Sequence, residues 1–531
     1  MQLNLKTFFE RAESYFPDNP LVSRQADGRL FRYRYADYCR RTRQLASALA
    51  GLGIGPGDKV ATLGWNTHRH LELYFAVPCL GAILHTVNIR LSDEHITYIV
   101  NHAQDVALFV DPDLLPVVER LAPSLTSLRH VVVLDDRAPG GSLPGLRGYE
   151  ELIADCDPRF AFPELDENAP CGMCFTSATT GDPKGVVYAQ RGLYLHTLAL
   201  CLRDTLAIGE HDTVLPVVPM FHANSWGLPY AAVAMGASLV LPGPHPNAAD
   251  ILGLIADEGV TLAAAAVTVG VELYAQLKKT PRDVGRLRGL MLGGSATPEA
   301  LMRRFQEEYG VPVLTAWGAT EAAPLATVTH VRRAALAEGP DAAIRARVRQ
   351  GIPVPGVEIK VLDEAGQSVP RDDAHVGEVY ARGPWIAAEY YRDARSRDGF
   401  ADGWWRSGDI ATLGQDGSIR LIDRAKDLVK SGGEWISSVE LENELAACPG
   451  VREAAVVAMP DPRWQERPIA FVVPAQENEV PDAEMLGAWL GRRFPKWWIP
   501  DRFDIVASLP RTGVGKVDKR SLRRRAADLA T

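Results

Sequence analysis

The stretch TSATTGDPKGVV, residues 176–187, carries the strongest chemical signal in this chain. A run of small hydroxyl residues leads into a Gly-Asp-Pro-Lys-Gly turn. Backbone N–H groups in such a turn form a cradle for an anion, and a lysine adds a point charge for terminal phosphates. Hydroxyls and charge come from Thr176, Ser177, Thr179, Thr180 and Lys184. We therefore predict a phosphate-binding loop, with an ordinary polar surface turn as the alternative.

Two positions distinguish this loop from other phosphate loops. In GxxxxGK[ST] loops a serine or threonine follows the lysine, whereas Gly185 follows Lys184 here, which disfavours a P-loop NTPase. The third residue is Ala178, where a phosphate-wrapping loop is expected to use glycine. If that position needs positive φ or close contact with phosphate, a methyl group costs about 1–3 kcal/mol. This cost corresponds to a factor of roughly 5 to 150 in binding or rate.

Composition bounds the class of protein. A chain of 531 residues exceeds the size of one hydrophobic core and indicates two to four domains. Hydrophobic residues make up 47% and charged residues 23%, which is ordinary for a globular protein, and the net charge of −9 disfavours general nucleic-acid binding. The basic stretch KVDKRSLRRR at 516–525 is a local exception, which we interpret as a solvated helix face rather than a site for a charged ligand.

Targeting signals and cysteine usage point to one compartment. Charges interrupt every apolar run near the N-terminus, so we expect no signal peptide. The apolar stretch from Ala231 falls well short of the ~20 residues that cross a bilayer, so we expect no transmembrane segment. Cys171 and Cys174 have redox or zinc-pair spacing, but no second pair completes such a site, and we interpret both as core residues of a buried strand. These features predict a cytoplasmic protein.

Hydrophobic patterning predicts the fold class. Short β-rich runs alternate with helical patterns through most of the chain, which indicates α/β layers with mainly parallel sheets. We expect strands within 59–66, 106–111, 130–135 and 237–243, and helices at 71–82 and 299–309. After about residue 350 turn signals separate further strands in a smaller β-rich region.

The domain organisation follows from the change in pattern near the C-terminus. From about Asp423 a further alternation of helices and strands is long enough to form its own small core. We therefore expect a large, multi-subdomain α/β N-terminal lobe with the β-rich region, residues 1–424. A small mobile α+β C-terminal domain, residues 425–531, follows a hinge at Arg424–Asp427.

Six further motifs follow the phosphate loop in order. They are VVPMFHANSWGLPY (217–230), LGGSATP (292–298), AWGATEAAP (316–324), WWRSGDIA (404–411), LIDRAKDLVKSGGEWIS (421–437) and PRTGVGK (510–516). With TSATTGDPKG, this set resembles the signatures of the adenylate-forming superfamily of acyl-CoA synthetases, luciferases and peptide-synthetase adenylation domains. One such motif is a weak signal, but seven in order are very specific. Medium- and long-chain fatty acyl-CoA synthetases are the closest resemblance.

The resemblance implies an ATP site with Mg²⁺. Asp409 would accept hydrogen bonds from both ribose hydroxyls, as a charged carboxylate does strongly. Glu321 would bind Mg²⁺ and Thr320 would lie near the phosphates, since Mg²⁺ suits a carboxylate plus substrate oxygens. Lys516 would bridge the acid and the α-phosphate and stabilise developing charge. The remaining nucleotide-binding candidates are Ala178 and Gly181 of the phosphate loop, and Gly294, Ser295, Ala296, Ala316, Trp317 and Gly318 beside adenine.

The superfamily runs two half-reactions, which the resemblance extends to this chain. A carboxylate and ATP give acyl-AMP and pyrophosphate; the small domain then swings at its hinge, and the CoA thiolate displaces AMP. Lys426 occupies the hinge position, and the turn that follows resembles the loop lining the pantetheine channel. Glycines fit a thin channel because they bring backbone without side chains. The candidates here are Arg424, Lys426, Lys430, Gly432, Gly433, Glu434 and Trp435.

The acyl pocket is expected around the FHANSWG segment. His222, also a catalytic candidate, and Trp226 lie where the superfamily shapes this pocket. The tryptophan resembles the gate residue of fatty acyl-CoA synthetases, with an ordinary core tryptophan as the alternative. Val267, at the end of a run of small residues, and Gly294 complete the predicted pocket. Small walls leave room for a wide lipophilic acid, fatty or polycyclic, and no basic residue is evident to pair a second carboxylate.

Two departures motivate an alternative hypothesis. Besides Ala178, Ala316 replaces a glycine that often precedes the aromatic residue of the Thr-Glu motif. Both lie on the ATP side, so adenylation could be weakened, leaving an enzyme that chiefly converts preformed acyl-AMP to acyl-CoA. The counterweight is that the ATP-side residues Lys184, Thr320, Glu321 and Lys516 all persist. Because the resemblance gives Lys516 a role only in the first step, we prefer the full two-step ligase.

Other classes remain as alternatives. They are a luciferase-like monooxygenase, a peptide-synthetase adenylation domain, a stand-alone enzyme that loads a carrier protein, and a non-enzymatic adenylate-binding scaffold. The expected partners are a small-molecule carboxylic acid, a nucleotide and CoA, and the sequence leaves a homodimer open.

Overall fold

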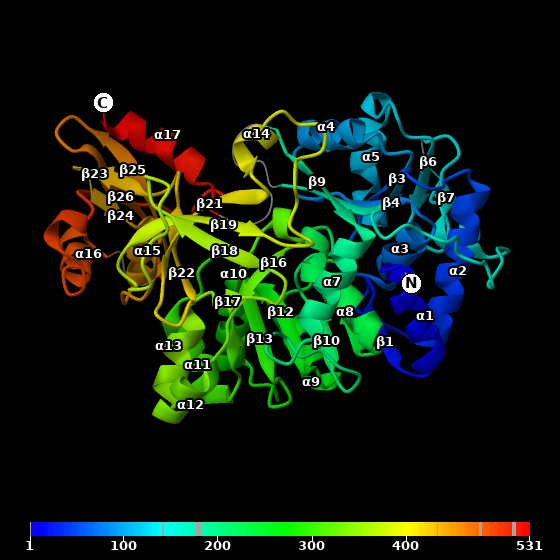
Figure 1. Cartoon of the computed structure of the whole chain (residues 1–531), viewed down its shortest axis with the longest axis horizontal. Coiled ribbons are helices and arrows are strands. Elements are labelled where there is room, and N and C mark those ends of the chain that lie inside the picture. Colours follow the sequence, from blue (N-terminus) through cyan, green and yellow to red (C-terminus); the bar gives the residue numbers. More distant parts are fainter. Residues whose placement is uncertain are drawn as a thin grey trace. The chain divides into compact units, whose positions relative to one another are not determined.

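The computed structural model describes residues 2–140, 143–176, 182–432, 434–476, 481–511 and 517–530. Within these ranges the chain forms two compact units (Figure 1). The first holds residues 182–358 and 381–405 together with the described residues before 177. The second holds residues 359–380 and the described residues from 406 onward. The predicted domain border between 424 and 425 stays a prediction.

Two seven-stranded sheets form the framework of the first unit. One has the order β14-β13-β12-β10-β11-β1-β2 and the other the order β7-β6-β5-β3-β4-β8-β9. Every pair is parallel except the edge pairs β1–β2 and β8–β9, as the alternating strand and helix patterns predict.

The strands of these two sheets include the four expected from the sequence. The first sheet comprises β1 Pro20–Arg24, β2 Leu30–Arg34, β10 Thr213–Pro216, β11 Ser238–Leu241, β12 Leu262–Ala266, β13 Gly289–Gly293 and β14 Val313–Leu314. The second comprises β3 Lys59–Leu63, β4 Ile83–Thr86, β5 Ala107–Val110, β6 His130–Val133, β7 Arg147–Gly148, β8 Pro170–Phe175 and β9 Gly185–Ala189. Cys171 and Cys174 are buried in β8, which confirms their interpretation as core residues.

Helices connect these strands. The α-helices of the first unit are α1 Leu5–Tyr15, α2 Tyr35–Gly51, α3 His68–Cys79, α4 Asp93–Ala103, α5 Leu115–Leu121, α6 Tyr149–Ile153, α7 Gln190–Cys201, α8 Leu228–Met235, α9 Ala248–Asp257, α10 Val267–Lys279, α11 Glu299–Tyr309, α12 Arg333–Glu338, α13 Pro340–Val348 and α14 Ser396–Gly399. Single 3₁₀ turns are η1 Pro112–Leu114, η2 Ala122–Ser124 and η4 Thr320–Ala322, whereas η3 Ala223–Gly227 is a left-handed turn. Helix α9 begins with a capping box, in which Asn247 and Asp250 bond each other's backbone N–H. Of the described helices, none is long and apolar enough to cross a membrane.

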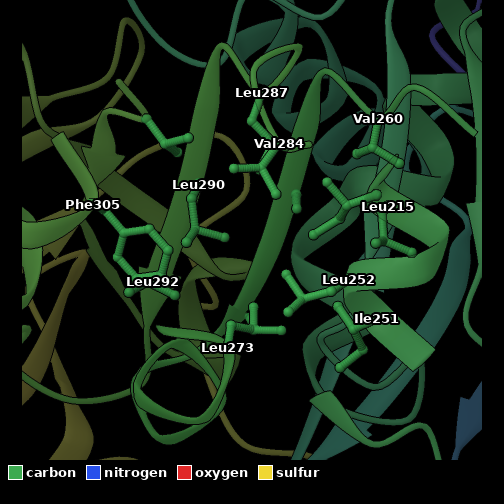
Figure 2. Packing of buried hydrophobic residues seen from close by; sticks show 14 of the residues in the cluster. Leu215, Ile251, Leu252, Val260, Leu273, Val284, Leu287, Leu290, Leu292 and Phe305 are labelled. Atoms are coloured by element: carbon green, nitrogen blue, oxygen red, sulfur yellow. The ribbon is translucent and has the colours of Figure 1, made fainter. Parts of the chain in front are cut away.

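The first sheet buries one large apolar cluster against its helices. Leu290 and Leu292 of β13 and Phe305 of α11 belong to it (Figure 2). Parallel strands covered by helices are apolar along most of their length, and β13 is buried at all five positions. This cluster fixes the C-terminal end of β13, where the motif at 292–298 begins.

Smaller sheets follow in the chain. An antiparallel three-stranded sheet comprises β15 Ala316–Gly318, β16 Leu325–Val328 and β17 Ile352–Pro353. A five-stranded sheet has the order β18-β19-β21-β20, with β22 paired to β21. Its strands are β18 Glu358–Leu362, β19 Val376–Arg382, β20 Phe400–Ala401, β21 Trp404–Leu413 and β22 Ile419–Arg424. These strands are the β-rich region that the turn signals predict.

The C-terminal part of the second unit is a sheet covered on both faces. The strands are β23 Val429–Ser431, β24 Glu434–Ile436, β25 Val451–Asp461, β26 Gln465–Pro474 and β27 Arg502–Ile505. The helices are α15 Ser438–Ala446, α16 Ala483–Leu490 and α17 Lys519–Ala530, with a 3₁₀ turn η5 Lys496–Trp498. Val472 packs with α15 and α16, whereas its neighbour Phe471 packs with α17. Alternate residues of β26 therefore serve the two faces of the sheet.

The basic C-terminal stretch is only in part a solvated helix face. Lys519 pairs with Glu442 at 2.7 Å, and Arg525 pairs with Asp504 at 2.7 Å. Ion pairs within the second unit thus use part of this positive charge to attach α17.

Candidate active site

The ends of the phosphate loop are fastened to each other. Strands β8 and β9 are antiparallel, with Phe175 opposite Gly185. Beyond this pair, the Thr176 N–H donates to the Lys184 carbonyl at 2.9 Å, and the Lys184 N–H donates to the Thr176 hydroxyl at 3.1 Å. The hairpin therefore fixes the position of Lys184 directly before β9. Ser177, Ala178, Thr179, Thr180 and Gly181 lie outside the described residues, and their roles stay predictions.

A tyrosine outside the seven motifs joins the loop to the Thr-Glu motif. The Lys184 ammonium lies 4.0 Å from the centre of the Tyr390 ring, in cation–π geometry. The hydroxyl of the same ring donates to Glu321 Oε1 at 2.7 Å. Burial, with the nearby Glu321 carboxylate, raises the pKa of Tyr390 far above its usual value. The phenol therefore stays a neutral hydrogen-bond donor.

Backbone contacts fix the Thr-Glu motif. Thr320 and Glu321 are buried in the short turn η4. The Thr320 carbonyl accepts a hydrogen bond from the Tyr188 hydroxyl at 2.8 Å, and the Glu321 carbonyl accepts one from the Ala387 N–H at 2.7 Å. These bonds hold the turn from both sides and leave the Glu321 carboxylate directed to Tyr390.

The Glu321 carboxylate suits a magnesium ion. It is a hard oxygen donor, and its Oε1 accepts a hydrogen bond from a neutral group, the Tyr390 hydroxyl, rather than from a cation. The same part contains no group of three or more His, Cys, Asp or Glu side chains able to hold a metal. This arrangement fits Mg²⁺ held by one carboxylate together with substrate oxygens, rather than by a cage of protein ligands.

Three of the predicted adenine-side residues form the short, crowded strand β15. Trp317 is 4% exposed and stacks on Trp405, with ring centres 5.8 Å apart and planes 15° apart. Gly318 approaches backbone so closely that a Cβ would lie 1.5 Å from the Pro324 carbonyl oxygen. Ala316 lies in strand β15, paired with Val328, and alanine adopts such backbone without strain. The alanine at 316 therefore gives no backbone reason for a weakened ATP site.

Gly294 sits at a turn that requires glycine. It follows directly on β13 and has φ +86°. Backbone of this kind is costly for residues with a Cβ. The neighbouring Ser295 is exposed and Ala296 half-buried, so the turn presents short side chains at the end of the sheet.

The acyl-site segment contains a left-handed turn. Five consecutive residues, 223–227, have positive φ, and four of them carry side chains. Left-handed backbone costs such residues about 1–2 kcal/mol each. The buried Ser225 hydroxyl donates to the Val218 carbonyl at 2.6 Å and helps to hold the turn. Strain of this kind gathers at functional sites, which agrees with the predicted role of the segment.

The left-handed turn sets the position of Trp226. The indole of Trp226 packs on Gly293, where a Cβ would lie 2.8 Å from the ring. His222 directly precedes the turn and is half-buried. Val267 begins α10 and belongs to the apolar cluster of the first sheet. The roles of these residues toward an acyl group stay predictions.

In the second unit, two nucleotide candidates pair with each other. Asp409 Oδ1 lies 2.6 Å from Arg424 Nε, and the Asp409 N–H donates to the Ser407 hydroxyl at 3.0 Å. Arg424 also begins the predicted hinge, where the N–H groups of Asp427 and Leu428 both donate to its carbonyl. Lys426 is exposed at the centre of this turn.

The glycine turn after the hinge approaches an aromatic residue. Gly432 has φ +62°, and its N–H donates to the Trp464 carbonyl at 2.9 Å. A Cβ on Gly432 would lie 2.8 Å from the Trp464 ring. The Lys430 ammonium lies 4.5 Å from the centre of the Trp435 ring. Gly433, the side chain of Glu434, and Lys516 lie outside what the structure describes.

Comparison with known proteins agrees with these motifs. Residues 9–391 match the AMP-binding enzyme family, and residues 440–516 match the AMP-binding enzyme C-terminal domain. Because the first match covers well over half of the chain, this chain belongs to the AMP-binding enzymes. The predicted adenylate-forming superfamily is confirmed.

Several similar proteins are CoA ligases. The long-chain-fatty-acid–CoA ligase of Thermus thermophilus is 46% identical over 98% of this chain and 95% of its own length. The medium-chain-fatty-acid–CoA ligase of Ectopseudomonas oleovorans is 39% identical over 99% of this chain and 97% of its own. Among solved structures, the anthranilate CoA ligase AuaEII in complex with anthranoyl-AMP matches with a TM-score of 0.88 at 25% identity, over 100% of this chain and 98% of that one. The predicted fold is confirmed.

Proposed function

We propose that this chain is an AMP-forming acyl-CoA ligase, an acid–thiol ligase that activates a lipophilic monocarboxylic acid. One observation carries the proposal. A lysine at the end of the phosphate loop and a buried glutamate contact the same neutral ring, in a chain similar along its whole length to CoA ligases. Phosphate charge and a cation can thus be bound next to each other.

In the first half-reaction a carboxylate oxygen of the acid attacks the α-phosphorus of ATP. The new bond is the acyl–phosphate anhydride, and the bond to the β-phosphate breaks, releasing pyrophosphate. Lys184 supplies positive charge toward the phosphates from the fixed end of its hairpin. Mg²⁺, when bound at Glu321, neutralises phosphate charge there. Lys516 is the proposed donor to the charge that develops at the α-phosphate.

In the second half-reaction the CoA thiolate attacks the acyl carbonyl. The thioester bond forms, the anhydride C–O bond breaks, and AMP leaves with the electron pair. Asp409 is proposed to hold the ribose hydroxyls through both steps, and the turn at Gly432 to admit pantetheine. A glycine at that place keeps the backbone close to Trp464 without a side chain in the channel.

Products identified by mass spectrometry provide the direct test. The purified chain receives ATP, Mg²⁺, CoA and an acid library that includes saturated chains of several lengths and polycyclic acids. We expect acyl-CoA and AMP in equal amounts, formed from monoacids and not from diacids. CoA-independent products would indicate a luciferase-like enzyme instead, and acyl transfer to a carrier protein alone would indicate a carrier-loading enzyme.

The comparisons do not favour the alternative with a weakened ATP step. A parallel assay separates the two hypotheses by comparing ATP–pyrophosphate exchange with thioester formation from synthetic acyl-AMP. We expect comparable rates in both. A slow exchange that Ala178→Gly accelerates by roughly fivefold or more would restore the alternative, since that is the lower bound for a strained residue at this site.

Two further predictions concern the location of the protein in the cell and its oligomeric state. A cytoplasmic location can be checked by fractionation of expressing cells. A homodimer can be checked by light scattering of the purified chain.

A further inference from the structure

We propose that Tyr390 is a positioning residue of the adenylation half-reaction, which fixes the Lys184 ammonium and the Glu321 carboxylate together before substrates bind. The proposal rests on the function proposed above and adds a residue to it. It starts from the segment 387–395, which lies outside all seven sequence motifs yet contacts two of them.

Backbone atoms first place this segment. The Ala387 N–H donates to the Glu321 carbonyl at 2.7 Å, and the Tyr391 N–H donates to the Gly185 carbonyl at 2.8 Å. Farther along, Arg395 Nη1 donates to the Asp182 carbonyl at 3.0 Å. The segment is thus bonded at one end to the Thr-Glu motif and along the rest to the end of the phosphate loop.

The Tyr390 side chain contacts the charged groups of both motifs. Its ring face meets the Lys184 ammonium at 4.0 Å, and its hydroxyl meets Glu321 Oε1 at 2.7 Å. A direct pair between this lysine and this glutamate would cancel both charges. A neutral phenol contacts both groups and cancels the charge of neither.

The ring itself is held from several sides. The Tyr390 N–H donates to the Ser396 hydroxyl at 2.9 Å, and Phe400 packs edge-on with ring centres 5.0 Å apart. Gly399 lies so close that a Cβ would be 3.0 Å from the Tyr390 ring. With 4% exposure, the ring has little freedom to move. A rigid support of this kind holds reacting groups in productive geometry at low entropic cost.

Tyr390→Phe tests the hydroxyl while keeping the ring. We expect ATP–pyrophosphate exchange to fall by roughly 10- to 100-fold, the range for losing a group that orients a metal ligand. The Mg²⁺ concentration for half-maximal exchange should rise, whereas thioester formation from synthetic acyl-AMP should stay within about twofold of wild type. Tyr390→Leu, which also removes the ring beside Lys184, should weaken ATP binding in the absence of Mg²⁺ as well.

Calorimetry gives a readout that does not depend on turnover. ATP is titrated into each protein with and without Mg²⁺, and the Mg²⁺-dependent gain in affinity is compared. We expect this gain to shrink by roughly tenfold in Tyr390→Phe, because Glu321 loses its orienting donor. In Glu321→Gln the gain should already be lost, and adding Tyr390→Phe should reduce it no further, since both changes act on one interaction.

Tyr35→Phe is the matched control. Tyr35 is fully buried in the same unit and donates one hydrogen bond, to the Ala237 carbonyl at 2.8 Å, away from the phosphate loop. Its loss should lower thermal stability about as much as Tyr390→Phe does, with both half-reactions unchanged.

Three outcomes are decisive. An unchanged Mg²⁺-dependent gain in Tyr390→Phe would overturn the proposal, and so would equal losses in both half-reactions together with lower thermal stability. A loss confined to exchange and to the Mg²⁺-dependent gain would support it. If wild type formed no thioester from any acid, the proposed function would fail instead, while calorimetry would still report on Tyr390.

Discussion

The two compact units hold their candidate carboxylates in opposite ways. In the first, Glu321 accepts a hydrogen bond from the neutral Tyr390 hydroxyl at 2.7 Å. In the second, Asp409 forms an ion pair with Arg424 at 2.6 Å. Both carboxylates are buried, at 7% and 6% exposure, so burial does not distinguish them. The two carboxylates differ in the charge of the partner, which is neutral for Glu321 and positive for Asp409.

This difference matches the ligands that the two groups are proposed to bind. A neutral donor leaves nearly the full negative charge of Glu321 for a cation, whose attraction is strong at a buried site. Ribose hydroxyls are neutral donors, so a carboxylate that binds them can share its charge with a guanidinium. Arg424 is 46% exposed, and a pair of that kind rearranges at little cost. We therefore expect Glu321 to bind a cation and Asp409 to bind neutral hydroxyls.

Glu321→Gln should have the largest effect, because it removes the charge that the neutral partner preserves. We expect ATP–pyrophosphate exchange to fall by roughly 10²- to 10³-fold, as when one group that stabilises transition-state charge is lost. Thioester formation from synthetic acyl-AMP should change little. Rates of both half-reactions, measured side by side at saturating Mg²⁺, check this.

The matched control is Glu308→Gln. Glu308 also accepts a hydrogen bond from a tyrosine, Tyr274, at 2.8 Å, but it lies on the surface of α11 and pairs with Lys278 at 3.0 Å as well. The Glu308→Gln substitution should leave the rates of both half-reactions at wild-type values. If ATP–pyrophosphate exchange by Glu321→Gln stayed within threefold of wild type, a hydrogen bond from a tyrosine hydroxyl to a carboxylate would not indicate a cation site.

Asp409→Asn should have an intermediate effect that spreads over both half-reactions. The amide keeps one acceptor oxygen but loses the charge, and hydrogen bonds to charged groups contribute about 1.5–3 kcal/mol. We expect AMP to bind roughly 10- to 150-fold more weakly, measured by calorimetry. Asp504→Asn, which loses a similar pair with Arg525 in the same unit, is the control and should not change AMP affinity.

The sequence predicted those parts of the fold and site that local chemistry specifies. Alternating patterns predicted the parallel sheets, and α11 begins and ends at the expected residues, because its apolar face repeats with helical period. Glu321, Asp409 and Lys184 were identified from short motifs. Each has a charge whose chemistry is evident without knowledge of its neighbours.

The partners of these residues could not be predicted in the same way. Tyr390 lies 206 residues after Lys184 and 69 after Glu321 in the chain, so no local spacing links the three. The one available signal in the sequence is the adjacent pair Tyr390–Tyr391. If either tyrosine is buried, its hydroxyl usually needs a hydrogen-bond partner, but the sequence does not say which residue that partner is. The left-handed turn at 223–227 contains a glycine and an asparagine, which adopt positive φ more readily, but its other three residues give no sign of it. Both features arise from tertiary packing.

Arg424→Gln should have the smallest effect and tests the second half of the comparison. The guanidinium side of this ion pair is 46% exposed and screened by solvent, so we expect AMP affinity to fall by no more than about fivefold. The loss reflects a less well-oriented Asp409, and added salt should weaken AMP binding by wild type more than by the variant, because screening acts on the pair. Arg406→Gln, which breaks the nearby pair with Glu378 at 2.8 Å, should leave AMP affinity unchanged. A loss as large as that of Asp409→Asn would mean that the Arg424 guanidinium itself binds the nucleotide. The two carboxylates would then differ in the ligands that they and their neighbours bind, and not in the charge of the partner that holds each one in place.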